Sequence, residues 1–166
     1  MQDFTSTLSI VARGERELLI TRQFSAPREL VFRAMTDAEL VARWMTGPAG
    51  WQMVDSKAKV APGGAFRHAW RHDDGREMAM VGEYREVDRP ARIVRTECFE
   101  FGCEAQAGEQ LATMTLVQVD GVTEVCVVVL YPSAEARDGA LASGMEDGLA
   151  ESYRMLDLQL ATAALG

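Results

Sequence analysis

The sequence predicts an α+β domain in which a curved antiparallel sheet wraps around one long C-terminal helix. Apolar and polar residues alternate from residue 51 to residue 131, with turn dipeptides between the runs, which is typical of an antiparallel meander. Two short stretches of helical spacing precede these runs, and a longer one follows them at 132–165. A sheet with one apolar face would bury that face against the long helix.

The 166 residues are the size of one ordinary domain. We expect residues 1–14 to form a polar N-terminal tail and residues 15–164 to form a single domain. The first strand is expected at 17–24, where ELLITRQF is a short run of strand-favouring residues.

Two short helices are expected to follow this strand. Pro27 stands at a position that the first turn of a helix tolerates. Thr36 or Asp37 would cap the second helix, in which Leu40 and Trp44 are four residues apart. The segment GPAG at 47–50 ends the helical pattern.

Six strands of the meander should begin at Trp51 and continue at 65–72, 76–87, 92–101, 110–119 and 123–131. A two-residue turn at Asp120-Gly121 sets Val119 opposite Val122. The residues at 102–109 have low apolar content and are expected to form an exposed connection.

The turn at Asp74-Gly75 is less regular. A two-residue turn there would place Met78 and Met80 on the face opposite Phe66 and Trp70, so we expect a longer loop, and the register of this hairpin stays open.

The segment 132–165 is expected to be one helix of about thirty residues. Each glycine inside a helix costs roughly 1 kcal/mol relative to alanine, so Gly139, Gly144 and Gly148 suggest that a sheet, a partner or a ligand comes close. The predicted apolar stripe of this helix consists of Leu141, Met145, Leu149, Tyr153, Leu156 and Leu160.

Composition excludes several classes of protein. The formal charge is −8 without a block of Lys or Arg, which argues against nucleic acid as a partner. No run of 18 apolar residues and no signal-peptide pattern occurs, so we expect a cytoplasmic protein without a membrane span. Cys98, Cys103 and Cys126 are odd in number and dispersed, which predicts reduced thiols rather than disulfides or a zinc site.

Five segments within roughly residues 15–161 carry a family resemblance: APRELVFRAMTD, RWMTGPAGW, APGGAFRHAW, DGREMAMVGEYREVDRPARIVRT and YPSAEARDGALASGMEDGLAESYRMLD. They resemble the START-like, helix-grip superfamily (SRPBCC), and within it the group named for the activator of Hsp90 ATPase. This resemblance implies a seven-stranded sheet that grips the last helix, with a hydrophobic cavity between them, and it places the glycines where the helix backs onto the sheet or forms a cavity wall. Because one such cavity hosts unrelated functions, the resemblance predicts the fold and not the activity.

A set of Met, aromatic and Leu side chains is the candidate wall of such a cavity. Met adapts to irregular shapes, and ligand cavities have apolar walls with a few polar groups. The same residues could simply fill the core, and both interpretations stay open. The candidate ligand-binding residues are Trp44, Trp51, Phe66, Trp70, Met78, Met80, Met114, Met145, Leu149 and Tyr153.

The candidate acid or base residues are His68, Glu83 and Arg71. His68 could titrate near neutral pH in a pocket, and an arginine could hold a carboxylate or enolate. His68 and His72 share a strand face but stand about 13 Å apart by strand rise, too far to chelate one ion. We therefore expect no metal and no cofactor.

Three functions remain. The first is binding of a small hydrophobic or amphipathic ligand between the sheet and the last helix. The second is a cyclase- or dehydratase-like enzyme that uses the acid and base residues above, and the sequence leaves open whether any reaction is catalysed. The third is a protein-interaction role like that of the Hsp90 activator. A homodimer through the long helix or a sheet edge also stays open.

Overall fold

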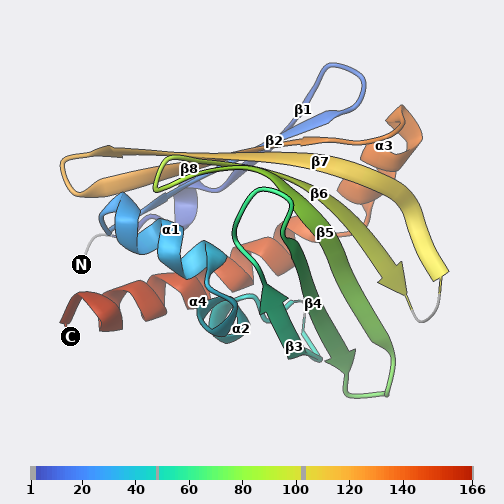
Figure 1. Cartoon of the computed structure of the whole chain (residues 1–166), viewed down its shortest axis with the longest axis horizontal. Coiled ribbons are helices and arrows are strands. Elements are labelled where there is room, and N and C mark those ends of the chain that lie inside the picture. Colours follow the sequence, from blue (N-terminus) through green and yellow to red (C-terminus); the bar gives the residue numbers. More distant parts are fainter. Residues whose placement is uncertain (1–2, 48, 102–103, 166) are drawn as a thin grey trace.

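The computed structural model describes residues 3–47, 49–101 and 104–165, and within them eight strands form one antiparallel sheet in the order β1-β2-β8-β7-β6-β5-β4-β3. The sheet curves over α1 (Arg28–Thr36), α2 (Ala38–Trp44) and α4 (Met145–Leu165), which lie on its concave side (Figure 1). We call this concave side the inner face. The chain has the predicted α+β helix-grip fold. The strands are β1 (Ser9–Arg13), β2 (Glu17–Phe24), β3 (Trp51–Ala58), β4 (Ala65–His72), β5 (Glu77–Asp88), β6 (Arg92–Phe101), β7 (Glu104–Val119) and β8 (Val122–Leu130).

The β7–β8 hairpin has the register that the sequence predicts. Asp120 and Gly121 both have positive φ, 52° and 77°, as a two-residue turn that matches strand twist requires. Val119 therefore pairs with Val122. This confirms which side chains of the two strands face inward.

The β4–β5 hairpin has a longer loop, as expected. The backbone N–H of His72 donates to the carbonyl of Arg76 at 2.8 Å, and three residues, 73–75, lie between them. Trp70 therefore pairs with Met78, which settles the register and puts both side chains on the inner face.

Two segments predicted to be irregular are strands. Residues 9–13, within the expected tail, form β1 and pair with β2. This edge strand is almost entirely exposed, so it lacks the buried alternation that would have revealed it. β7 begins at Glu104, inside the expected connection, and a register shift opposite Glu97 and Phe99 interrupts its pairing with β6. Cys103 lies outside the described residues, and Cys98 and Cys126 are free and half-buried.

The predicted C-terminal helix is two helices, α3 (Ala134–Ala142) and α4. Gly144 ends the first one with φ of +80°, a conformation that favours glycine. A Cβ at Gly139 or Gly144 would meet nothing within 4 Å, so the expectation that these glycines mark a close approach is wrong. Leu141 is 39% exposed because α3 does not continue the stripe of α4.

The two short helices are held by local hydrogen bonds. The Asp37 carboxylate caps α2 by accepting from the backbone N–H of Glu39 at 3.0 Å. The indole N–H of Trp44 donates to the carbonyl of Ala34 at 2.8 Å and ties α2 to α1. Both helices can therefore present an apolar side to the sheet and to α4.

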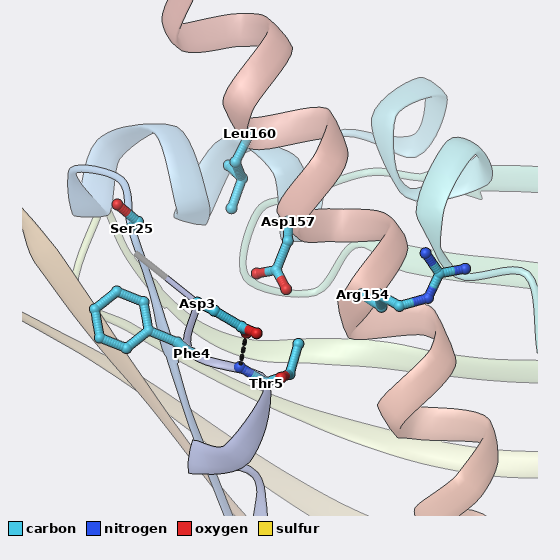
Figure 2. Close-up of a pocket in the computed structure, with 7 residues that line it drawn as sticks. All are labelled: Asp3, Phe4, Thr5, Ser25, Arg154, Asp157 and Leu160. Atoms are coloured by element: carbon cyan, nitrogen blue, oxygen red, sulfur yellow. Dashed lines mark hydrogen bonds between the residues drawn. The ribbon is translucent and has the colours of Figure 1, made fainter. Parts of the chain in front are cut away.

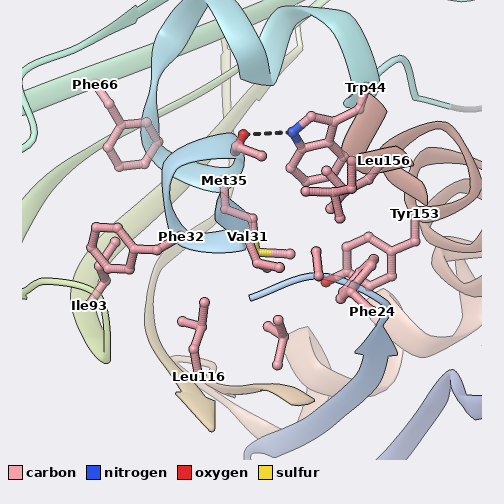
Figure 3. Packing of buried hydrophobic residues seen from close by; sticks show 14 of the residues in the cluster. Phe24, Val31, Phe32, Met35, Trp44, Phe66, Ile93, Leu116, Tyr153 and Leu156 are labelled. Atoms are coloured by element: carbon pink, nitrogen blue, oxygen red, sulfur yellow. Dashed lines mark hydrogen bonds between the residues drawn. The ribbon is translucent and has the colours of Figure 1, made fainter. Parts of the chain in front are cut away.

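The main core lies between these helices, α4 and the inner face (Figure 3). Tyr153 of α4 stands at its centre, with its ring centroid 5.3 Å from that of Phe24 and 5.9 Å from that of Trp44. Leu156 and Leu160 are also buried, which confirms this half of the predicted stripe. Among the described helices, none is long and apolar enough to cross a membrane.

An ion pair joins the sheet to α4. The Arg22 side chain on β2 is 2% exposed, and its guanidinium donates to both carboxylate oxygens of Asp157, at 3.0 and 2.5 Å. The same guanidinium lies 4.7 Å from the centroid of the Phe24 ring. Because the Arg22 guanidinium is out of water, its charge needs the Asp157 carboxylate as a partner. The pair therefore fixes the position of α4 along β2.

We predict that Asp157→Asn lowers the free energy of unfolding by about 2 kcal/mol, because Arg22 would keep a buried charge without its partner. The effect stays below that of a fully enclosed pair because the Asp157 side chain is 22% exposed. Urea denaturation followed by tryptophan fluorescence measures it. The control is Glu151→Gln, which removes the exposed partner of Arg154 on the same helix and should leave the midpoint unchanged. Equal effects of the two substitutions would contradict the prediction.

Candidate functional site

A group of polar side chains lies on the inner face, surrounded by the apolar core. Strand pairing brings them together: Tyr84 of β5 is opposite Arg95 of β6, and Glu97 of β6 is opposite Gln110 of β7. Because alternate residues of a strand share a face, Arg95 and Glu97 point the same way. We call these four residues the inner polar cluster.

Glu97 is the centre of this cluster. Its carboxylate accepts from Nε of Arg95 at 3.0 Å and from Nε2 of Gln110 at 2.9 Å. The Arg95 and Glu97 side chains are 16% and 11% exposed to solvent. Burial alone would lower the pKa of Arg95, but the neighbouring Glu97 carboxylate outweighs it, so the pKa is raised and the arginine stays charged.

The ring of Phe66 packs against the guanidinium of Arg95. The guanidinium of Arg95 lies 4.3 Å from the centroid of the Phe66 ring, a cation–π contact in a desolvated place. A Cβ at Gly82 would stand 2.7 Å from the Phe66 ring and 1.9 Å from the carbonyl oxygen of Thr96. Gly82 is therefore needed for the close approach that places the ring under Arg95.

His68 is buried on the same face. The hydroxyl of Ser56 donates to the carbonyl of Ala38 at 2.7 Å, so its oxygen accepts from Nδ1 of His68 at 3.0 Å. Burial, followed by the nearby positive charge of Arg95, lowers the pKa of His68 to about 4. A neutral imidazole with this pKa is a weak general base at neutral pH.

The predicted ligand-binding residues all pack in the two cores of the protein. Trp44, Phe66, Trp70, Met80 and Tyr153 are buried in the main core, and Trp51, Met78, Met114 and Leu149 are half-buried against it. Met145 packs against the smaller core around Leu18 and Tyr131.

Two of the three predicted acid or base residues lie elsewhere. Arg71 is exposed on the outer face and pairs with Glu77 at 2.9 Å. Glu83 is also exposed, because the alternation along β5 turns it away from its neighbour Tyr84. The structure therefore does not bring His68, Arg71 and Glu83 together.

The inner polar cluster was missed at the level of sequence. In the run RIVRTECFEF both alternating sets contain polar and apolar residues, so the pattern does not tell which set faces inward. Gly82 within a strand was the available signal, since such a glycine often marks a close approach.

Two of the surface pockets among the described residues are of similar size. One, of about 290 Å³, lies between the N-terminal segment and α4, with Asp157 and Leu160 reaching from the helix towards Phe4 and Thr5 (Figure 2). The other, of about 370 Å³, is a polar hollow on the outer face between Asp55 and Glu100. Within the part of the chain that the structure describes, no group of three or more His, Cys, Asp or Glu could hold a metal ion.

The comparisons with known proteins agree with this architecture. The model of the family described as "Activator of Hsp90 ATPase homolog 1-like protein" matches residues 25–161. The chain belongs to this family. No curated protein matches this AHSA1-like chain.

Solved structures of similar proteins share the fold. A protein from Rhodobacter sphaeroides is 31% identical with a TM-score of 0.86, covering 93% of this chain and 99% of its own. A protein from Nitrosomonas europaea is 20% identical with a TM-score of 0.80, covering 93% and 100%. An AHSA1-like protein from Aeromonas hydrophila is 20% identical with a TM-score of 0.67, covering 85% and 93%. At their identity, the last two show the fold alone.

We predict that His68 makes the protein less stable in mild acid. A histidine whose folded pKa lies below its unfolded value contributes stability that is complete above about pH 6.5 and is lost as the pH falls to about 4. The loss should be about 3 kcal/mol. In His68→Asn, which keeps a donor to Ser56, this part of the pH dependence should disappear from urea denaturation curves. His72→Asn, at the other histidine, should retain it. The prediction would be contradicted if the free energy of unfolding changed with pH in the same way for the wild type and for His68→Asn.

Proposed function

We propose that this AHSA1-like protein binds a small amphipathic molecule on the inner face, between the sheet and α4. The inner polar cluster is the observation that carries the proposal. It is a charged pair that keeps partial exposure although the residues around it are apolar, so it can contact the polar end of a ligand.

The placement of this pair argues against a purely structural role. Arg95 and Glu97 are two residues apart on one strand, so their contact does not hold separate elements together. A buried ion pair is often no more stabilising than apolar residues of the same size. The Arg22–Asp157 pair differs, because it joins β2 to α4. Recognition of a ligand would explain why the Arg95–Glu97 pair lies inside the protein.

Half-buried apolar side chains supply the other end of the site. Met114, Val127 and Leu149 pack against the main core without being fully buried, and they come from β7, β8 and α4. Phe99 of β6, two residues from Glu97 on the same strand, is half-buried in the same way. A ligand with an apolar body and one polar end fits this combination.

The enzyme alternative has less support. Of its three residues, Arg71 and Glu83 lie on the outer face, and His68 is a weak base. A protein-interaction role, as in the family's description, is favoured by no particular cluster of the described residues.

We predict that the protein binds the neutral apolar dye Nile red and that Met114→Trp weakens this binding at least about tenfold, since the larger ring occupies inner-face volume. Fluorescence titration measures the affinity, and native mass spectrometry gives the stoichiometry. The matched control is Val117→Trp, three residues further along the same strand and 59% exposed. It should bind like the wild type, with thermal melts confirming that both variants fold. Equal weakening by the two substitutions, or no binding by the wild type, would overturn the proposal.

A further inference from the structure

Among the described residues, Arg22 and Arg95 lie on the inner face, and each already has a carboxylate partner. Arg95 is bonded to Glu97 on its own strand, and Arg22 is bonded to Asp157 of α4. Each pair therefore has no net charge. Tyr153 packs on the ring of Phe24, which the guanidinium of Arg22 also contacts.

The other titratable groups that face this region are uncharged at neutral pH. Burial raises the pKa of Tyr131 and of Tyr153 to about 12, and burial lowers that of His68 to about 4. Over the described residues, the surroundings of the inner polar cluster are therefore balanced in charge. Outward-facing charges such as Arg71 and Glu100 lie on the other side of the sheet.

A charged ligand would disturb this balance. A ligand carboxylate close to Arg95 would also stand close to Glu97, and two carboxylates that share one guanidinium away from bulk water repel each other strongly. An ammonium group close to Glu97 would meet Arg95 in the same way. A hydroxyl, carbonyl or amide can accept from the arginine or donate to the carboxylate without adding a charge.

We propose that the Arg95–Glu97 pair selects ligands whose polar end is uncharged and excludes carboxylates and amines of the same shape. This selectivity rests on the proposed function, since it concerns the same site. The pair acts as a dipolar contact with one donor side and one acceptor side. Gln110 orients its acceptor side by donating to the Oε1 atom of Glu97.

Three probes of equal chain length test the selectivity: decan-1-ol, decanoate and decylamine. Their affinities are measured by displacement of Nile red at neutral pH. The wild type should bind decan-1-ol at least about tenfold more tightly than either ion.

Changing one partner should change the selectivity in a definite direction. Glu97→Gln leaves the charge of Arg95 without its carboxylate, so the affinity for decanoate relative to that for decan-1-ol should rise at least about tenfold. Arg95→Gln leaves Glu97 and should favour decylamine in the same way. Glu100→Gln, on the outer face of the same strand, is the matched control and should keep the wild-type order of affinities.

The double variant Arg95→Leu/Glu97→Leu serves if a single variant fails to fold. It removes both hydrogen-bonding partners of the ligand's polar end, so it should bind decan-1-ol at least about tenfold more weakly than the wild type while still binding Nile red, and an unchanged affinity for decan-1-ol would overturn the role of the pair. A wild type that binds decanoate or decylamine as tightly as decan-1-ol would overturn the selectivity and leave the proposed function standing. Displacement of Nile red by none of the three probes overturns the selectivity too, and failure of Nile red itself to bind overturns the proposed function with it.

Discussion

The antiparallel strands send alternate side chains to one concave face, and α4 covers that face. This geometry constrains the whole interior. The same surface supplies the apolar contacts of Tyr153 and Leu156 and also holds any polar group that faces inward. A curved sheet can surround a helix in this way only if its inner residues pack against the helix at many points. The short helices α1 and α2 lie beside α4 on the same concave side of the sheet (Figure 1).

Placing charges on such a face requires that they be paired. Arg22 meets this requirement across two elements, by bonding to Asp157, and so contributes to the position of α4. Arg95 meets it within one strand, by bonding to Glu97, and lies on the ring of Phe66. The two pairs obey the same electrostatic rule. The first pair joins the sheet to α4, whereas the contacts of the second pair stay within the sheet, which is why the second is the better candidate for recognition.

Membership of the AHSA1-like family accounts for the architecture and leaves the chemistry to the chain's own residues. The sequence resemblance and the solved structures agree on a sheet that grips a helix. Such a scaffold can host different sites, since the inner side chains vary while the strand geometry stays. In this chain the inner face carries the combination of Tyr84, Arg95, Glu97 and Gln110.

The sequence by itself determined the order of most elements, because the period of hydrophobicity and the turn residues act locally. The Asp120-Gly121 turn set the β7–β8 register, and the helix spacing predicted α1, α2 and the buried stripe from Tyr153 onward. Local patterns failed where local signals were weak: β1 has no buried face, and Gly144 ends a helix that a periodic pattern would have continued. Only the tertiary structure decided the site. It placed Arg71 and Glu83 outside and brought Arg95, Glu97 and Gln110 together, because these contacts depend on which face of each strand meets α4 and on the pairing of separate strands.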